Sequence, residues 1–228
     1  MSKVESFIDS LWIEKGLSKN SLDSYSRDLN LFLNYLDSSK VELIDVTRVE
    51  IMEFMSFRLS KGLSAKTVSR NLSVLKAFFG YLESRNLIRN NPSKDIESPK
   101  LPRKLPNTLT EQQINDLLDA PDEKTNLGFR DKTMIEALYS CGMRVSELLN
   151  LKLSDINFNQ GVIRILGKGS KERIVPIGEE LINLLKKYIE IIRPELLKNV
   201  TEDHLFLNSR GAGITRQGFW LRIKDYCL

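Results

Sequence analysis

Apolar residues in the first ninety positions recur every three or four residues, in four stretches divided by short polar or glycine-containing segments. Such spacing lines one side of a helix with apolar side chains. The fourth stretch is typical, with apolar positions at Val68, Leu72, Leu75, Phe78, Phe79 and Leu82. The pattern predicts a helical domain over residues 1–90.

Helix-start signals accompany these stretches. Thr47 is followed three residues later by Glu50, and Thr110 by Gln113, which is the spacing of a capping box. Ser64 is a suitable N-cap for the fourth helix because its hydroxyl can accept from a free backbone N–H. We therefore expect helices to start after residues 47, 64 and 110.

The segment from Asn90 to Thr108 differs in composition. It reads NNPSKDIESPKLPRKLPNT, contains four of the seven prolines and has no helical period. Proline fixes φ and disfavours a helix at the residue before it. Residues 91–107 are therefore predicted to form an extended linker between two domains, and this linker is basic through Lys100, Arg103 and Lys104.

The period of the pattern changes within the second predicted domain, residues 108–228. Helical spacing runs up to a break at residues 139–142. Two β-branched runs, residues 162–165 and 174–177, then flank the turn GKGSKE, which is a hairpin pattern. The predicted fold class is mainly α with a small β-hairpin or sheet, in two domains.

Three shorter elements are expected after the hairpin. An amphipathic helix starts at Glu179 and is expected to end at Pro194. His204–Leu207 has the composition of a short strand, and the final run ITRQGFWLRIKDYCL is typical of a helix start.

Composition limits the classes of protein. With 228 residues and 41% hydrophobic content, the chain can bury a core in one large or two small domains. The net charge of +4 is compatible with nucleic acid binding but is weak evidence alone. The cysteines, Cys141 and Cys227, lie outside any metal-ligand spacing and are interpreted as reduced thiols. No apolar stretch reaches membrane-spanning length, so we expect a soluble, cytoplasmic protein without a metal.

Two groups of polar residues are candidates for chemistry. Arg144 and Glu147 share a helical turn after the break, Arg144 among apolar neighbours that suggest burial, and Lys168 and Lys171 lie in the hairpin turn. This arrangement suits phosphate binding, but a structural salt bridge and a solvated turn explain it equally well. The fourth helix carries a face of bases and hydroxyls, which suits DNA phosphates or simply water: Lys66, Thr67, Ser69, Arg70, Ser73 and Lys76.

Several runs resemble one family in the same order. GMRVSELLNL followed by GKGSKERIVPIG is similar to the catalytic core of Xer-type tyrosine recombinases, a branch of the phage integrase family. SLDSYSRDLNLFLNYL, SAKTVSRNLSVLKAFFGYL and TRQGFWLRIKDY resemble further segments of that family. The resemblance extends along nearly the whole chain.

The resemblance implies site-specific DNA recombination, as in chromosome dimer resolution. A tyrosine hydroxyl cleaves a DNA strand and keeps it as a 3′-phosphotyrosyl link, without metal or other cofactor. An N-terminal SAM-like domain and the catalytic domain close on the duplex as a clamp. The implied partners are double-stranded DNA and further recombinase protomers, in a homo- or hetero-tetramer, with no membrane.

The resemblance also assigns roles to residues of this chain. Arg144 matches the first catalytic arginine and Lys168 the catalytic lysine. A guanidinium can grip two phosphate oxygens, and an ammonium can protonate the leaving oxygen. The implied DNA-binding residues are Lys66, Thr67, Arg70, Lys76, Lys100, Arg103, Lys104, Lys171 and Arg173.

The chain departs from the family pattern at its C-terminal end. The family's His-x-x-Arg pair and nucleophilic tyrosine have no counterpart before Leu228, so we expect an incomplete catalytic domain that is inactive alone. The alternative is a non-catalytic DNA-binding protein or an inactive fragment. His204 is interpreted as structural, and Tyr226 is rejected as nucleophile because RIKDY resembles the helix before the missing motif. The other tyrosines are expected in the core: Tyr25, Tyr35, Tyr81, Tyr139 and Tyr188.

Overall fold

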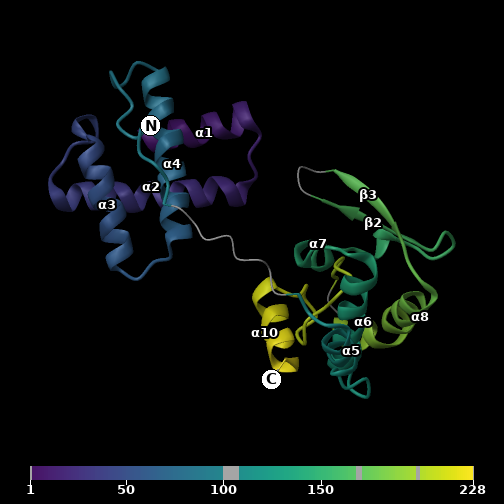
Figure 1. Cartoon of the computed structure of the whole chain (residues 1–228). Coiled ribbons are helices and arrows are strands. Elements are labelled where there is room, and N and C mark those ends of the chain that lie inside the picture. The colour runs from purple at the N-terminus through teal and green to yellow at the C-terminus, as the bar shows by residue number, and fades with distance from the viewer. Residues whose placement is uncertain (1, 100–107, 168–170, 199–200, 228) are drawn as a thin grey trace. The chain divides into compact units, whose positions relative to one another are not determined.

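The computed structural model describes residues 2–99, 108–167, 171–198 and 201–227. The chain divides into two compact units, Met1–Leu105 and Pro106–Leu228. Helices form most of both units, and the second unit adds one small antiparallel sheet (Figure 1). The predicted fold class is confirmed.

The first unit contains the four predicted helices: α1 (Lys3–Lys15), α2 (Lys19–Ser39), α3 (Arg48–Ser60) and α4 (Ala65–Ser84), with a 3₁₀ turn η1 (Leu43–Asp45). The apolar stripe of α4 is buried and contacts α2 and α3. Aromatic rings interlock in this core, as Phe7 does with Phe78 at a centroid distance of 5.3 Å. The unit therefore owes its stability to its own apolar core.

The predicted caps are present in both units. Thr47 and Glu50 form a capping box, as do Thr110 and Gln113. The Ser64 hydroxyl accepts from the backbone N–H of Thr67 at 3.2 Å. Each cap satisfies an N–H group that the first helical turn leaves free.

The compact part of the first unit extends beyond residue 90. Ser93 is buried, and Ile96 packs into the apolar core of this unit. The start of the proline-rich segment is therefore folded against the helices, because an isoleucine side chain gains more from burial than from an extended course through water.

The second unit begins with α5 (Glu111–Asp119), α6 (Asn126–Cys141), α7 (Val145–Leu149) and the turn η2 (Leu153–Asp155). The sheet follows, in the order β1 (Ile156–Asn157), β2 (Val162–Leu166) and β3 (Glu172–Pro176), with all pairs antiparallel. Ile163 and Ile165 of β2 point into the core, whereas Arg164 and Leu166 point outward. This alternation is that of a strand with one buried face.

After the sheet the chain is helical again. α8 (Glu179–Lys187) runs into a π-helical turn η4 (Tyr188–Ile192) and then α9 (Arg193–Leu197), and α10 (Arg216–Tyr226) follows a longer loop. The prediction that Pro194 ends the helix is wrong. Pro194 lies in the first turn of α9, where its missing N–H costs little.

Two further predictions differ from the structure. His204–Leu207 forms only isolated bridges, Lys152 with His204 and Leu207 with Gly213, and not a strand of the sheet. Tyr139, which was expected in the core, is 59% exposed near the end of α6. Apolar spacing cannot distinguish the inner face of a helix from its edge when neighbouring polar residues are few.

Candidate active site and nucleic-acid interface

Arg144 lies where the chain turns out of α6. Gly142 has a left-handed backbone, with φ 55°, and ends α6. Glycine adopts this conformation without steric cost. Met143 is then buried, and Arg144 becomes the N-cap residue of α7. The turn and the buried Met143 together fix the point from which the Arg144 side chain leaves the backbone.

Glu147 is the centre of the candidate site. Its side chain is only 4% exposed and accepts from two arginines. Arg144 donates from Nη1 to Oε1 at 2.8 Å, and its backbone N–H donates to Oε2 at 2.8 Å. Arg173 donates from Nη1 to Oε1 at 2.9 Å and from Nη2 to Oε2 at 2.7 Å. One buried carboxylate therefore holds two guanidinium groups from α7 and β3.

This arrangement sets the charge of the site. The hydrogen bonds from Arg173, with those from Arg144, lower the pKa of Glu147 to about 2, although burial opposes the shift. Glu147 is therefore ionised at neutral pH. Two arginines on one carboxylate leave a net charge of +1, which suits an anionic ligand such as a phosphate.

The expectation that Arg144 is buried is wrong. Its side chain is 69% exposed, and that of Arg173 is 37% exposed. The buried member of the group is Glu147, because an acid that accepts from several charged donors can be taken out of water at lower cost. The salt-bridge alternative is thus present in the structure, and it leaves the Arg144 guanidinium facing solvent.

The end of the hairpin lies against the same carboxylate. The Gly167 N–H donates to the Lys171 carbonyl at 2.8 Å, which closes the end of β2 on β3. A Cβ atom on Gly167 would lie 3.5 Å from Oε1 of Glu147. Gly167, the described residue that precedes the candidate lysine in sequence, therefore lies beside the arginine pair. Lys171 is exposed, whereas Lys168 lies outside the described residues, as do Lys100, Arg103 and Lys104.

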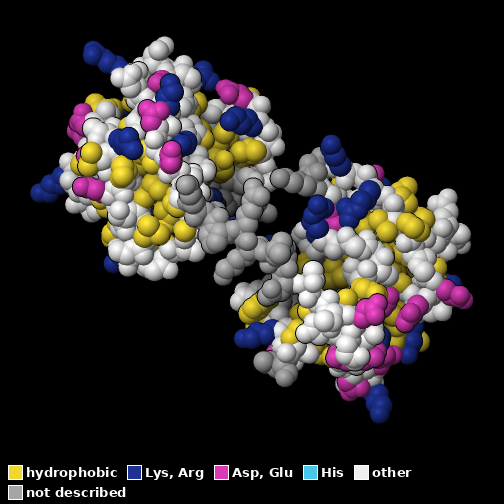
Figure 2. All heavy atoms as spheres, viewed as in Figure 1, with side chains coloured by type: hydrophobic (Ala, Val, Ile, Leu, Met, Phe, Trp, Pro, Cys, Tyr) yellow, Lys and Arg dark blue, Asp and Glu magenta, His cyan; other side chains and the backbone are white. Residues whose placement is uncertain are grey.

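Basic side chains gather over α7 and the neighbouring part of the sheet in Figure 2, whereas acidic side chains gather around α5 and α8. The acidic residues in question include Glu111 and Asp116 on α5 and Glu179 and Glu180 on α8. The small net charge of the chain therefore hides a separation of charge over this unit. A phosphate backbone would be attracted to the α7 side.

The predicted DNA face of the first unit lies on α4. Lys66 and Arg70 are exposed there, one helical turn apart. Thr67 is half-buried and its hydroxyl lies 3.0 Å from that of Ser64, so it contributes to the helix cap. Lys76 is half-buried, and its Nζ lies 3.4 Å from the Lys94 carbonyl oxygen. The outward cations of this face are therefore Lys66 and Arg70.

Tyr226 is engaged in a partly buried polar network. Its hydroxyl donates to Oδ2 of Asp131 at 2.7 Å and accepts from Nη2 of Arg222 at 2.7 Å. Burial, together with the bond to Asp131, raises the pKa of Tyr226 to about 12. The hydroxyl is therefore neutral and already bonded, which agrees with its rejection as nucleophile.

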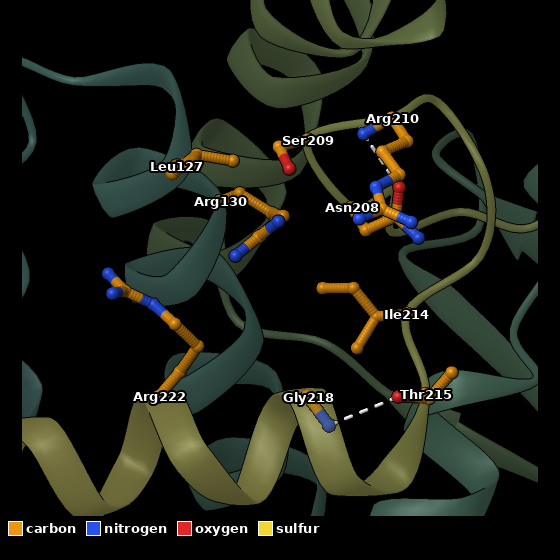
Figure 3. A pocket seen from close by; sticks show the side chains of 9 residues that line it. All are labelled: Leu127, Arg130, Asn208, Ser209, Arg210, Ile214, Thr215, Gly218 and Arg222. Atoms are coloured by element: carbon orange, nitrogen blue, oxygen red, sulfur yellow. Dashed lines mark hydrogen bonds between the residues drawn. The ribbon is translucent and has the colours of Figure 1, made fainter.

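The same network continues into a cavity of about 430 Å³ between α6, the loop before α10 and α10 itself (Figure 3). Arg130 lies in its wall, donates to Asp131 through Nε and Nη2, and donates to the Leu207 carbonyl at 2.7 Å. Arg222 closes the network from α10 by donating to Asp131 at 2.8 Å. The sequence analysis did not predict this network of Arg130, Asp131 and Arg222, although the adjacent charges of Arg130 and Asp131 within an apolar helix were a signal for it.

His204 has a structural environment. Its Nδ1 lies 2.7 Å from Oε1 of Glu202, and the same oxygen accepts from the backbone N–H of His204. Oε2 of Glu202 accepts from the backbone N–H of Gly213. The hydrogen bond with the His204 side chain, followed by those from the backbone N–H groups, lowers the pKa of Glu202 to about 2. Within the described ranges no group of three or more His, Cys, Asp or Glu residues could hold a metal ion, and no helix there is long and apolar enough to cross a membrane.

Comparisons with known proteins show the family of the chain. Residues 107–228 match the phage integrase family, and residues 4–86 match the phage integrase N-terminal SAM-like domain. The tyrosine recombinase XerD of Proteus mirabilis is 45% identical over 225 residues, 99% of this chain and 72% of that protein. The tyrosine recombinase XerD of Staphylococcus epidermidis (strain RP62A) is 41% identical over 226 residues, 99% of this chain and 77% of the relative.

Solved structures share the fold. The recombinase XerH bound to a palindromic difH substrate superposes with a TM-score of 0.71 at 23% identity, over 99% of this chain and 67% of that one. The Tn1549 transposon integrase in complex with a circular intermediate DNA gives 0.70 at 20% identity, over 100% and 79%. The family matches and the XerD relatives show that the chain belongs to the phage integrase family. Its resemblance to the XerD proteins over nearly its whole length makes it a Xer-type tyrosine recombinase within that family.

Proposed function

We propose that this chain acts in site-specific DNA recombination by holding a phosphodiester of double-stranded DNA at α7. Arg144 grips the non-bridging oxygens of the phosphate, and Lys168 protonates the leaving oxygen. Arg173 shares the carboxylate of Glu147 with Arg144 and lies where it can contact the same strand. The observation that carries the proposal is the buried Glu147, which fixes two partly exposed guanidiniums beside the base of the hairpin.

The chemistry of strand cleavage explains why these groups are needed. A tyrosine hydroxyl forms a bond to phosphorus while the bond to the 5′-oxygen breaks, and that oxygen takes up a proton. Negative charge grows on the non-bridging oxygens as this happens. A planar, permanently charged guanidinium stabilises that charge best when it is already in place. A lysine in a turn can supply the proton to the leaving oxygen.

The DNA partner contacts both units in the proposal. Contacts with backbone phosphates position a protein without reading the DNA sequence. The residues proposed to make these contacts are Lys66, Thr67, Arg70 and Lys76 of α4, the basic linker residues Lys100, Arg103 and Lys104, and Lys171. Further recombinase protomers join on the DNA. A lambda integrase of the same fold, 15% identical with a TM-score of 0.70, is a tetramer bound to a Holliday junction.

The setting follows from this partner. Chromosome dimer resolution is the role that we assign, and a cytoplasmic location goes with that role. We also keep the division into residues 1–90, 91–107 and 108–228 as the functional one. The start of the linker, through Ile96, packs on the first unit, and its basic residues are the proposed DNA contacts.

Substitution of Arg144 and Lys168 tests the catalytic assignment. We expect Arg144→Ala and Lys168→Ala each to lower cleavage of a nicked duplex by about a hundredfold or more, the scale for removing one transition-state donor. The assay uses this chain joined to the part of the Proteus mirabilis relative that it does not span. Unfolding curves confirm that the variants fold.

Arg164→Ala is the matched control. Arg164 is a β2 arginine of comparable exposure, 52%, that pairs with Asp155 at 3.0 Å on the outer face of the sheet. The Arg164→Ala variant should cleave the nicked duplex at a rate within a few-fold of the wild type. Full cleavage by Arg144→Ala or by Lys168→Ala would remove the corresponding residue from the proposal.

A further inference from the structure

A second buried carboxylate holds an outward arginine in the first unit. Asp28 on α2 is 4% exposed. Its Oδ1 accepts from Nη2 of Arg70 on α4 at 3.0 Å. The Arg70 side chain is 54% exposed, so one nitrogen is bonded at the protein surface while the rest of the guanidinium faces solvent.

The surroundings of Asp28 do not favour stability. Burial raises its pKa, while the charge of Arg70, the nearby amide of Asn71 and the charges of Arg58 and Arg27 lower it. In the described part of the chain, Oδ2 of Asp28, Nε of Arg58 and both amide atoms of Asn71 are buried without a hydrogen-bond partner. Buried polar atoms without partners destabilise a fold, and an apolar side chain at such a position is often better tolerated. The carboxylate therefore calls for an explanation other than stability.

We propose that Asp28 is a positioning residue for DNA binding, which holds Arg70 on the outer face of α4 so that its remaining N–H groups meet a DNA phosphate. Lys66 lies one turn earlier on the same helix, so two cations are presented at a fixed spacing. A guanidinium that is already ordered loses less side-chain freedom when it binds. This inference rests on the proposed use of the α4 face for DNA.

The sign of one substitution separates positioning from simple electrostatics. Asp28 carries negative charge next to the proposed DNA face, so charge alone predicts that Asp28→Asn binds duplex DNA more tightly. Positioning predicts weaker binding by about three- to tenfold, the scale for leaving one long side chain to be ordered on binding. The measurement is the affinity of the folded chain for a duplex at low salt, with unfolding curves in parallel. Unchanged or tighter binding by Asp28→Asn overturns the proposal.

Glu14→Gln is the matched control for lost negative charge. Glu14 pairs with Arg85 at 3.1 Å in the same unit, but both side chains are 56% exposed. Its loss should leave affinity unchanged or slightly increased. A fall in affinity as large as that of Asp28→Asn would show that any lost acid weakens binding, and the positioning role would be rejected.

Arg70 variants complete the test. Arg70→Lys keeps the charge but loses the planar fork of the guanidinium, so it should weaken DNA binding. This variant provides a folded protein for the test even if Asp28→Asn fails to fold. The double variant Asp28→Asn/Arg70→Ala should bind no more weakly than Arg70→Ala alone, because Asp28 acts through Arg70. Wild-type affinity in Arg70→Lys overturns the proposal.

The same series distinguishes two failures. If Lys66→Ala and Arg70→Ala both bind like the wild type, the α4 face is not a DNA contact, and the role of Asp28 fails with it. If both weaken binding while Asp28→Asn does not, the DNA face stands and only the positioning role is rejected.

Discussion

Three buried carboxylates, Asp28, Asp131 and Glu147, each hold at least one arginine whose side chain reaches the surface. A carboxylate is costly to bury unless charged donors surround it, and the planar fork of arginine supplies several donors at once. The arrangement fixes the direction of the guanidinium before a ligand arrives. At the scale of single residues, the buried acidic side chains of this protein orient arginine side chains.

Replacement of Glu147 tests this arrangement through stability. Because its pKa is about 2 in the fold against 4.5 ordinarily, its contribution is fully present above about pH 4.5 and is lost as pH falls toward 2. We expect Glu147→Gln to lower the free energy of unfolding by about 1–3 kcal/mol at pH 7, since the amide leaves two arginines poorly paired. Denaturant unfolding at several pH values measures this, and the difference from wild type should shrink below pH 4.

Glu172→Gln is the control. Glu172 is 56% exposed and lies 3.8 Å from Arg164, so its loss should change stability by less than about 0.5 kcal/mol. A Glu147→Gln variant as stable as wild type at pH 7 would contradict the role given to this carboxylate.

Secondary structure elements were the scale at which sequence reasoning worked best. The helix starts after Thr47, Ser64 and Thr110 were predicted because caps depend on residues three apart. The Arg144–Glu147 pair was visible for the same reason. Arg173 joins Glu147 across 26 positions, and Arg222 joins Asp131 across 91, so neither contact could be predicted from spacing. The π-helical turn before Pro194 escaped notice because it depends on packing and not on a local signal.

The turn between α6 and α7 gives a test at this scale. Gly142 has φ 55° and nothing within 4 Å of an added Cβ, so an alanine there would meet only backbone strain. We expect Gly142→Ala to destabilise the protein by about 1–2 kcal/mol. It should also reduce DNA cleavage by the chain joined to the Proteus mirabilis segment, because Arg144 follows two residues later. Thermal unfolding and the nicked-duplex assay measure the two effects.

Gly178→Ala provides the comparison for this turn. Gly178 also has open space around an added Cβ, but its φ is −71°. Alanine is a poorer N-cap of α8 than glycine, but it also restricts the unfolded chain by a similar free energy, so the change in stability should stay below about 0.5 kcal/mol. Equal destabilisation by the two variants would show that the left-handed backbone of Gly142 is not the cause.

At the scale of the whole molecule, the two units have separate apolar cores. Hydrophobic patterning predicted this division because each unit repeats its own apolar spacing and a proline-rich segment separates them. The sequence could not predict which basic side chains remain free to bind a ligand, because that depends on which of them form hydrogen bonds or ion pairs within the protein. Lys76 and Arg173 have internal partners, whereas Lys66 does not have one among the described residues.

Salt dependence of DNA binding tests the molecule as a whole. A net charge of +4 is small, so strong binding requires the bases to act in groups on phosphates. Each neutralised phosphate contributes about −0.9 to the slope of log affinity against log salt concentration. We expect a clearly negative slope for a duplex, and Lys66→Ala should make it shallower by about one. Lys124→Ala removes an exposed cation beside Glu123 and should leave the slope unchanged. A flat slope for the wild-type chain would contradict DNA binding through grouped phosphate contacts.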